Sequence, residues 1–217
     1  MTPPEQLGFG FDQMAEEQRT AHLPSTMEEA IPYYRKLIER HHAAMLAGDI
    51  PVAMKIREEA HDLAYKVNGG DTAIKGGPDA PAYVLDRATA APAGTLPMWG
   101  QTGEFTINVG TMPVRIEQEG IFGIGTSSGV WLGFGAHAVD FQKPFLSQTG
   151  YRSFLGCHAE MVPGMTPDVF ARDMIDAYVQ RECKGKLRQI ERSYVEREMA
   201  RRSKAASATQ PSRSPAR

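Results

Sequence analysis

Residues 25–70 read STMEEAIPYYRKLIERHHAAMLAGDIPVAMKIREEAHDLAYKVNGG, and they carry the strongest structural signal in the chain. A hydroxyl cap followed three residues later by an acid predicts a helix start near Met27. Apolar or semi-polar side chains then recur at helical spacing, first at Ile31, Tyr34, Ile38, His41 and Met45 and again at Val52, Ile56, Ala60, Leu63 and Val67. Gly48 ends the first stripe, and Pro51 suits the first turn of a second helix. Residues 27–67 are therefore predicted to form an antiparallel helical hairpin.

The chain after the hairpin changes in composition. Residues 69–103 are rich in Gly, Ala, Pro and Thr, which predicts an irregular linker. Short alternating apolar runs separated by turn residues follow over 104–141, including runs at 121–124 and 130–141, and they predict an antiparallel β-meander. The run over 130–141 is apolar at nearly every position, so we expect the corresponding strand to be central in the sheet.

The C-terminal third is predicted to be a loop, a helix and a tail. Residues 143–165 lack a clear period and are interpreted as an ordered loop. Thr166, Pro167 and Asp168 then signal a helix start, and the helix is predicted to run over 167–202 with an interruption at Gly185. Residues 203–217 have a disordered composition. With residues 1–24 as an extended N-terminal arm, residues 25–202 are expected to form a single α+β domain.

Formal charge is distributed unevenly along the sequence. Residues 181–217 hold 11 basic and 4 acidic side chains, a net charge of +7, whereas the first 180 residues hold 13 basic and 22 acidic side chains, a net charge of −9. Such a division predicts a charged partner, or docking of the tail on the body. The basic side chains expected to bind the partner are Lys184, Lys186, Arg188, Arg192, Arg197, Arg201 and Arg202.

Several classes of protein are disfavoured by composition. The sequence has no run of about 18 apolar residues, so no membrane-spanning helix is expected. The first residues, MTPPEQLGFGFDQ, carry neither a basic nor an apolar segment, which argues against a secretory signal. Two cysteines are too few for a disulfide framework, and a bacterial cytoplasm is the expected location.

A metal site is one alternative that the hairpin raises. Glu39 and His42 on the first helix, and Glu58 and His61 on the second, form two E-x-x-H patterns of the kind found in di-iron bundles. However, Glu58 and His61 lie roughly 170° and 130° from the centre of the apolar stripe of their helix. These groups should point away from the interface between the two helices. We therefore expect no metal and no other cofactor.

An enzyme is the other alternative. His137 lies on the apolar strand, and Arg152 lies in the adjoining loop, so a small hydrolase or metal-dependent enzyme would have its site between residues 143–158 and the sheet near His137. The glycine-rich run at 123–129 leads into a strand rather than a helix, which favours a turn over a phosphate-binding loop. The favoured hypothesis is a non-catalytic binding or accessory protein that engages a protein or nucleic-acid partner through residues 181–204. Interleaved glutamates between the arginines favour ion pairs within a solvated helix.

Overall fold

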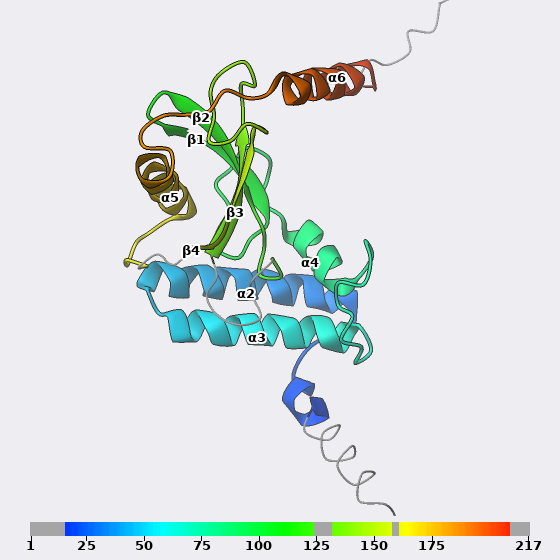
Figure 1. The fold of residues 1–217 in the computed structure, drawn as a ribbon. Coiled ribbons are helices and arrows are strands. Elements are labelled where there is room, and N and C mark those ends of the chain that lie inside the picture. Colours follow the sequence, from blue (N-terminus) through cyan, green and yellow to red (C-terminus); the bar gives the residue numbers. More distant parts are fainter. Residues whose placement is uncertain (1–15, 124–131, 158–160, 209–217) are drawn as a thin grey trace, which may run out of the picture.

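A computed structural model describes residues 16–123, 132–157 and 161–208. A helical hairpin lies at one end of the molecule, and a sheet stands on it with its strands directed away from the hairpin, as Figure 1 shows. The elements follow in the order α2 (Met27–Ala47), α3 (Ile50–Val67), α4 (Pro81–Thr89), β1 (Gly103–Val109), β2 (Met112–Gln118), β3 (Leu132–Ala138), β4 (Tyr151–Cys157), α5 (Pro167–Arg181) and α6 (Arg192–Ala208). The α+β fold predicted from the sequence is confirmed.

The helical hairpin forms where the sequence predicted it. The backbone N–H of Glu29 donates to Thr26 Oγ1 at 3.4 Å, which caps α2, and Val52 N–H donates to the Asp49 carboxylate at 3.1 Å, which caps α3. Gly48 ends α2 with a φ of 73°, a left-handed conformation that glycine adopts without steric cost. Local capping chemistry therefore sets both ends of α2 and the start of α3.

The four strands form an antiparallel meander in the order β1-β2-β3-β4, so β3 is central as predicted. The strand β4 was missed, because residues 143–165 were interpreted as a loop. Its sequence YRSFLGC mixes charged, small and aromatic residues, and its strand character depends on pairing with β3, where Phe154 stacks on Phe134 at 4.7 Å. The short strand expected at 121–124 was also wrong in its described part: residues 121–123 form a turn in which Ile121 and Phe122 are buried.

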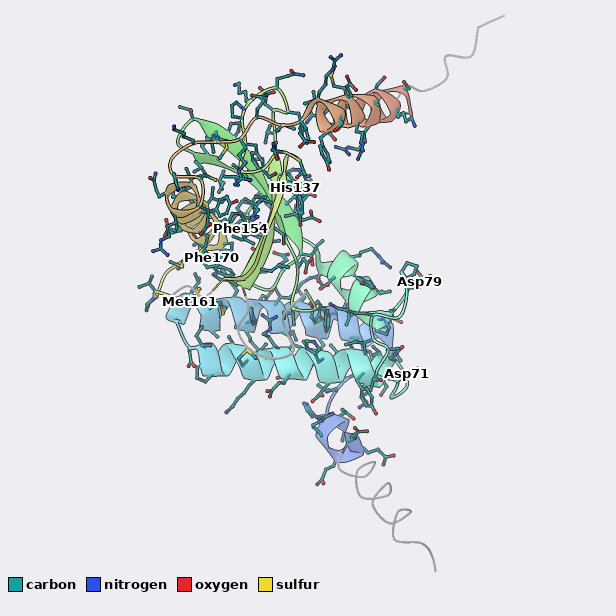
Figure 2. All side chains as sticks on the ribbon, viewed as in Figure 1. Asp71, Asp79, His137, Phe154, Met161 and Phe170 are labelled. Atoms are coloured by element: carbon teal, nitrogen blue, oxygen red, sulfur yellow. The ribbon has the colours of Figure 1, made fainter. Side chains whose placement is uncertain are left out.

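The two faces of the sheet have different chemistry. One face carries Phe105, Ile107, Val114, Ile116, Phe134, Ala136 and Phe154, all buried. Helix α5 covers this face, and its Phe170 contacts Phe134 at a ring distance of 6.0 Å. Figure 2 shows Phe154 and Phe170 on the α5 side of the sheet and His137 on the opposite side. The opposite face is polar, which leaves it available for function.

Tertiary contacts shape the segment that was predicted to be irregular. Residues 81–89 of the expected linker form α4, whose Ala82 and Leu85 are fully buried, with contacts to both helices of the hairpin. Pro81 occupies the first turn, where its missing N–H costs little. A helix of nine residues shows too short an apolar pattern to be predicted from sequence. A helix this short is also unstable alone, so α4 depends on its packing against the hairpin.

The C-terminal segment is not one helix. Helix α5 ends at Arg181, and Lys184 and Gly185 both adopt positive φ values of 49° and 74°, which an α-helix cannot accommodate. The chain then runs beside the 143–146 segment, where the backbones of Phe145 and Arg188 exchange two 2.8 Å hydrogen bonds. Helix α6 begins only at Arg192 and extends past the predicted end at 202. The described part of the predicted tail, residues 203–208, is therefore helical, and residues 16–20 of the predicted N-terminal arm are helical too.

A partly buried hydrogen bond between the hairpin and α4 leads to a pH-dependent prediction. Tyr34 O–H donates to the Asp86 carboxylate at 2.8 Å, and burial raises the pKa of Asp86 to about 6. A raised carboxyl pKa means that the folded state binds more protons than the unfolded state between about pH 4 and pH 6. The stability contribution of Asp86 therefore falls as the pH rises through that window.

Replacing Asp86 with Asn should remove this penalty, because the amide oxygen can still accept from Tyr34. We expect D86N to be more stable than the wild type above pH 6, by on the order of 2 kcal/mol, with the difference vanishing near pH 4. Urea unfolding at several pH values measures it. D79N, at a side chain that is 98% exposed, is the matched control. A D86N difference that did not change with pH would contradict this assignment.

Candidate functional site

Helix α6 stands apart from the rest of the molecule, at the end of the sheet far from the hairpin (Figure 1). Its first turn is anchored by Tyr194 and Val195, which pack partly buried against the core. Further along, Arg202 Nη2 donates to the Val139 carbonyl at 3.1 Å, and the guanidinium carbon lies 5.9 Å from the ring centroid of Phe141. These contacts hold the helix against the tip of β3 and leave most of its surface in solvent.

The basic residues predicted to bind a partner divide into two groups. Lys184, Lys186 and Arg188 lie on the segment between α5 and α6, whereas Arg192, Arg197, Arg201 and Arg202 lie on α6 itself. All seven are exposed. The expected single basic helix is therefore an exposed basic surface built from a loop and a helix.

Acidic residues pair with several of the α6 arginines. Arg192 Nε donates to Glu196 at 2.7 Å, and Glu198 accepts from Arg201 at 2.8 Å and from Arg202 at 2.7 Å. The hydrogen bonds from Arg201 are the main cause that lowers the pKa of Glu198 to about 2. Intrahelical ion pairing, which the interleaved glutamates predicted, is confirmed.

The polar face of the sheet forms a groove with α6. Arg115 Nη1 lies 2.6 Å from Glu104 Oε1, and His137 Nε2 lies 2.8 Å from Glu117 Oε2. The groove has a volume of about 480 Å³ and lies between the strands β1, β2 and β3 and the α6 side chains Glu198, Arg201 and Arg202. Its lining therefore brings the basic helix and His137 to one surface.

The alternative catalytic residues His137 and Arg152 are not brought together. Arg152 pairs with Ala136 across the β3–β4 ladder and shares its face, whereas His137 pairs with Tyr151 on the opposite face. The Arg152 guanidinium carbon lies 4.6 Å from the ring centroid of Tyr178 on α5. The partner that His137 does have, Glu117, was missed, since only the register between β2 and β3 places these residues in contact.

The four residues considered as metal ligands, Glu39, His42, Glu58 and His61, do not share contacts in the structure. His42 Nδ1 accepts from the Trp99 backbone N–H at 3.1 Å, and His61 Nδ1 donates to the Arg57 carbonyl at 2.8 Å. Glu39 and Glu58 are exposed. Within residues 16–123, 132–157 and 161–208, no group of three or more His, Cys, Asp or Glu side chains is placed to hold a metal ion.

Comparison with known proteins gives distant relatives. The chain is 30% identical over 196 residues to a protein from Escherichia coli named Protein KlcB, a match covering 89% of this chain and 46% of that protein. A second Escherichia coli protein of the same name is 37% identical over 141 residues, which cover 64% of this chain and 29% of the relative. The chain thus spans less than half the length of these bacterial relatives. No family model and no solved structure matches.

A search for membrane spans gives a negative result for the described part of the chain. None of its helices combines the length and the apolar character needed to cross a bilayer.

The ion pairs around Glu198 should stabilise α6 locally without stabilising the whole protein. We expect E198Q to increase amide hydrogen exchange over residues 199–204 by about two- to fivefold, because exposed pairs contribute little and act on the helix that carries them. The melting temperature of the protein should not change. E196Q, which removes a single exposed pair with Arg192, is the control and should have a smaller effect. Equal exchange rates in E198Q and the wild type would show that the pairs contribute nothing to the helix.

Proposed function

We propose that this chain is a non-catalytic binding or accessory protein that engages an anionic partner through residues 181–204. The observation that carries the proposal is the exposed basic helix α6, which projects from the sheet (Figure 1). The arginines of α6 are exposed, so a partner can reach them, although Arg192, Arg201 and Arg202 would share their charge with Glu196 and Glu198. A bacterial cytoplasm, where such a partner would be met, is the location we propose with it.

Electrostatics support an anionic partner. Residues 181–204 hold nine basic and four acidic side chains, a net charge of +5, while residues 1–180 have a net charge of −9. The acidic body would repel a polyanion, and the projecting helix presents the basic charge at a distance from most of that body. Nucleic-acid phosphates and an acidic protein surface are the two partners that this charge pattern fits.

Salt-dependent binding of the full-length protein to DNA and RNA tests the proposal. For a nucleic-acid partner, the logarithm of the binding constant should fall linearly with the logarithm of the salt concentration. The triple variant R197Q/R201Q/K204Q should reduce that slope by about one for each phosphate that the altered helix no longer binds. Glutamine maintains helix propensity, so the main change is in charge, although R201Q also removes one ion pair with Glu198.

The matched control is R35Q/K36Q/K55Q, which removes the same formal charge from exposed positions on the hairpin. It should leave the slope unchanged. If neither DNA nor RNA binds, the wild type and the α6 variant are compared by affinity capture of proteins from bacterial extract. A captured set that is identical for both proteins would overturn the proposal.

A second candidate function, a small hydrolase or metal-dependent enzyme, is supported by one observation. Glu117 lies 2.8 Å from His137 Nε2, the arrangement in which a carboxylate orients an imidazole that serves as a general base. If this candidate holds, H137Q should lose any ester- or phosphoester-hydrolysing activity found for the purified protein, by about 10²-fold or more. Unchanged activity in H137Q would remove the candidate, and R152Q, on the other face of the sheet, is the control.

A further inference from the structure

A cavity lies where the hairpin meets the polar face of the sheet, at the end opposite α6. It has a volume of about 150 Å³, and its lining includes His41 from α2, Arg57 from α3, residues 117–120 at the end of β2 and beyond it, and Gly123. The strand β4 contributes Tyr151 and Leu155, which are 46% and 59% exposed, so the cavity is reached from solvent over the sheet. A cavity of about this size admits a molecule as large as benzene.

Arg57 supplies a buried positive charge to this cavity. Arg57 is only 5% exposed, and its Nη2 donates a hydrogen bond to the Ile121 carbonyl at 3.1 Å. Among the described residues, Arg57 Nε has no hydrogen-bond partner. Burial lowers the pKa of Arg57 to about 10, which leaves it charged at neutral pH. A buried guanidinium N–H without an acceptor is costly, so this part of the cavity favours a ligand that presents an oxyanion oxygen to Arg57.

His41 supplies a hydrogen-bond acceptor to the same cavity. It is 1% exposed, and its Nδ1 lies 3.0 Å from the Trp99 carbonyl, which can only accept, so Nδ1 carries the proton. Burial lowers the pKa of His41 to about 4, and the neutral ring therefore has a lone pair on Nε2. Within the described residues, Nε2 has no hydrogen-bond partner. A ligand group that donates a hydrogen bond would satisfy it.

The hairpin brings the two groups together. His41 and Arg57 lie on opposite sides of the Gly48–Asp49 turn at equal sequence distance from residue 49, which places them at the same height on the antiparallel helices. Gly100 is also required there, because a Cβ at this position would lie 2.7 Å from His41 Nδ1 and 2.9 Å from Ile121 Cγ1. Two acidic residues, Glu117 and Glu119, line the cavity as well, and Glu117 is bound to His137.

We propose that this cavity binds a small oxyanion that also carries a hydroxyl group, with the anionic oxygens on Arg57 and the hydroxyl hydrogen donated to His41 Nε2. Hydrogen phosphate and small hydroxy acids share this chemistry. Glu117 and Glu119 disfavour polyanions, and the volume limits the ligand to a few heavy atoms. The site is independent of α6 and of the partner proposed for it.

Thermal unfolding of the full-length protein with inorganic phosphate, at constant ionic strength and neutral pH, tests the proposal. We expect a saturable rise in melting temperature with phosphate and a smaller rise with sulfate, which has no hydrogen to donate at this pH. Glycolate and acetate form a second pair that differs by a hydroxyl group, and glycolate should bind more tightly. Whether phosphate or glycolate binds better distinguishes a phosphate ligand from a hydroxy acid.

The variant R57M removes the guanidinium and retains an apolar side chain of similar length. Removal of the buried charge should offset the loss of the hydrogen bond to the Ile121 carbonyl. We therefore expect R57M to have a melting temperature close to that of the wild type without ligand, and to bind phosphate at least about tenfold more weakly. The α6 variant R197Q/R201Q/K204Q should bind phosphate as the wild type does.

Four outcomes would overturn the proposal. These are the absence of a saturable phosphate effect in the wild type, an equal effect in R57M, an effect that disappears only in the α6 variant, and equal stabilisation by the members of both ligand pairs. The ligand comparison uses the wild type alone, so it remains decisive if R57M does not fold.

Discussion

The position of the sheet on the hairpin depends on the way Trp99 is held by two consecutive histidines of α2. His41 donates to the Trp99 carbonyl at 3.0 Å, His42 accepts from its backbone N–H at 3.1 Å, and the indole N–H donates to the Met165 carbonyl at 2.8 Å. The indole also contacts Phe170 of α5 at 5.6 Å between ring centroids. One residue of an otherwise irregular segment thus joins the hairpin, the approach to α5 and the layer of phenylalanines on the sheet. Buried polar groups satisfied in this way specify one arrangement of the layers.

The sequence predicted the elements whose signals are local. Capping residues and apolar spacing were sufficient for α2 and α3, and alternation was sufficient for the strands β1 and β2. The strand β4 and the helix α4 could not be predicted, because each is stabilised by neighbours distant in sequence: Phe154 by Phe134, and Leu85 by the hairpin. The break between α5 and α6 was underestimated, because the pairing of Arg188 with Phe145 replaces helical hydrogen bonds over several residues.

The residues of the candidate sites divide in the same way, into those with local sequence signals and those brought together by the fold. The basic residues were selected from the composition of the sequence. All seven are exposed, and three of them lie outside any helix. The Glu117–His137 contact and the pairing of His41 with Arg57 at one cavity depend on register and layer packing, so residue types alone could not reveal them. The sequence placed His41 in an apolar stripe, and the residue is indeed buried. Which ring nitrogen carries the proton, however, depends on the hydrogen bond to the Trp99 carbonyl. Sequence reasoning found charges in solvent and missed polar groups inside the protein.

The topology of the meander also has a consequence for synthesis. Every strand pairs with the strand next to it in the chain, and the hairpin precedes the sheet that stands on it. During synthesis, α3 and the strands β2, β3 and β4 can therefore each pack on an element that precedes them in the chain. The phenylalanines of β3 and β4 are different, because they are covered by the later helix α5. In the described part of the chain, the phenylalanine face of the sheet is covered only when α5 packs on it, and the backbone pairing of Phe145 with Arg188 follows later in the sequence. Folding in chain order shortens the time during which that surface can meet another molecule.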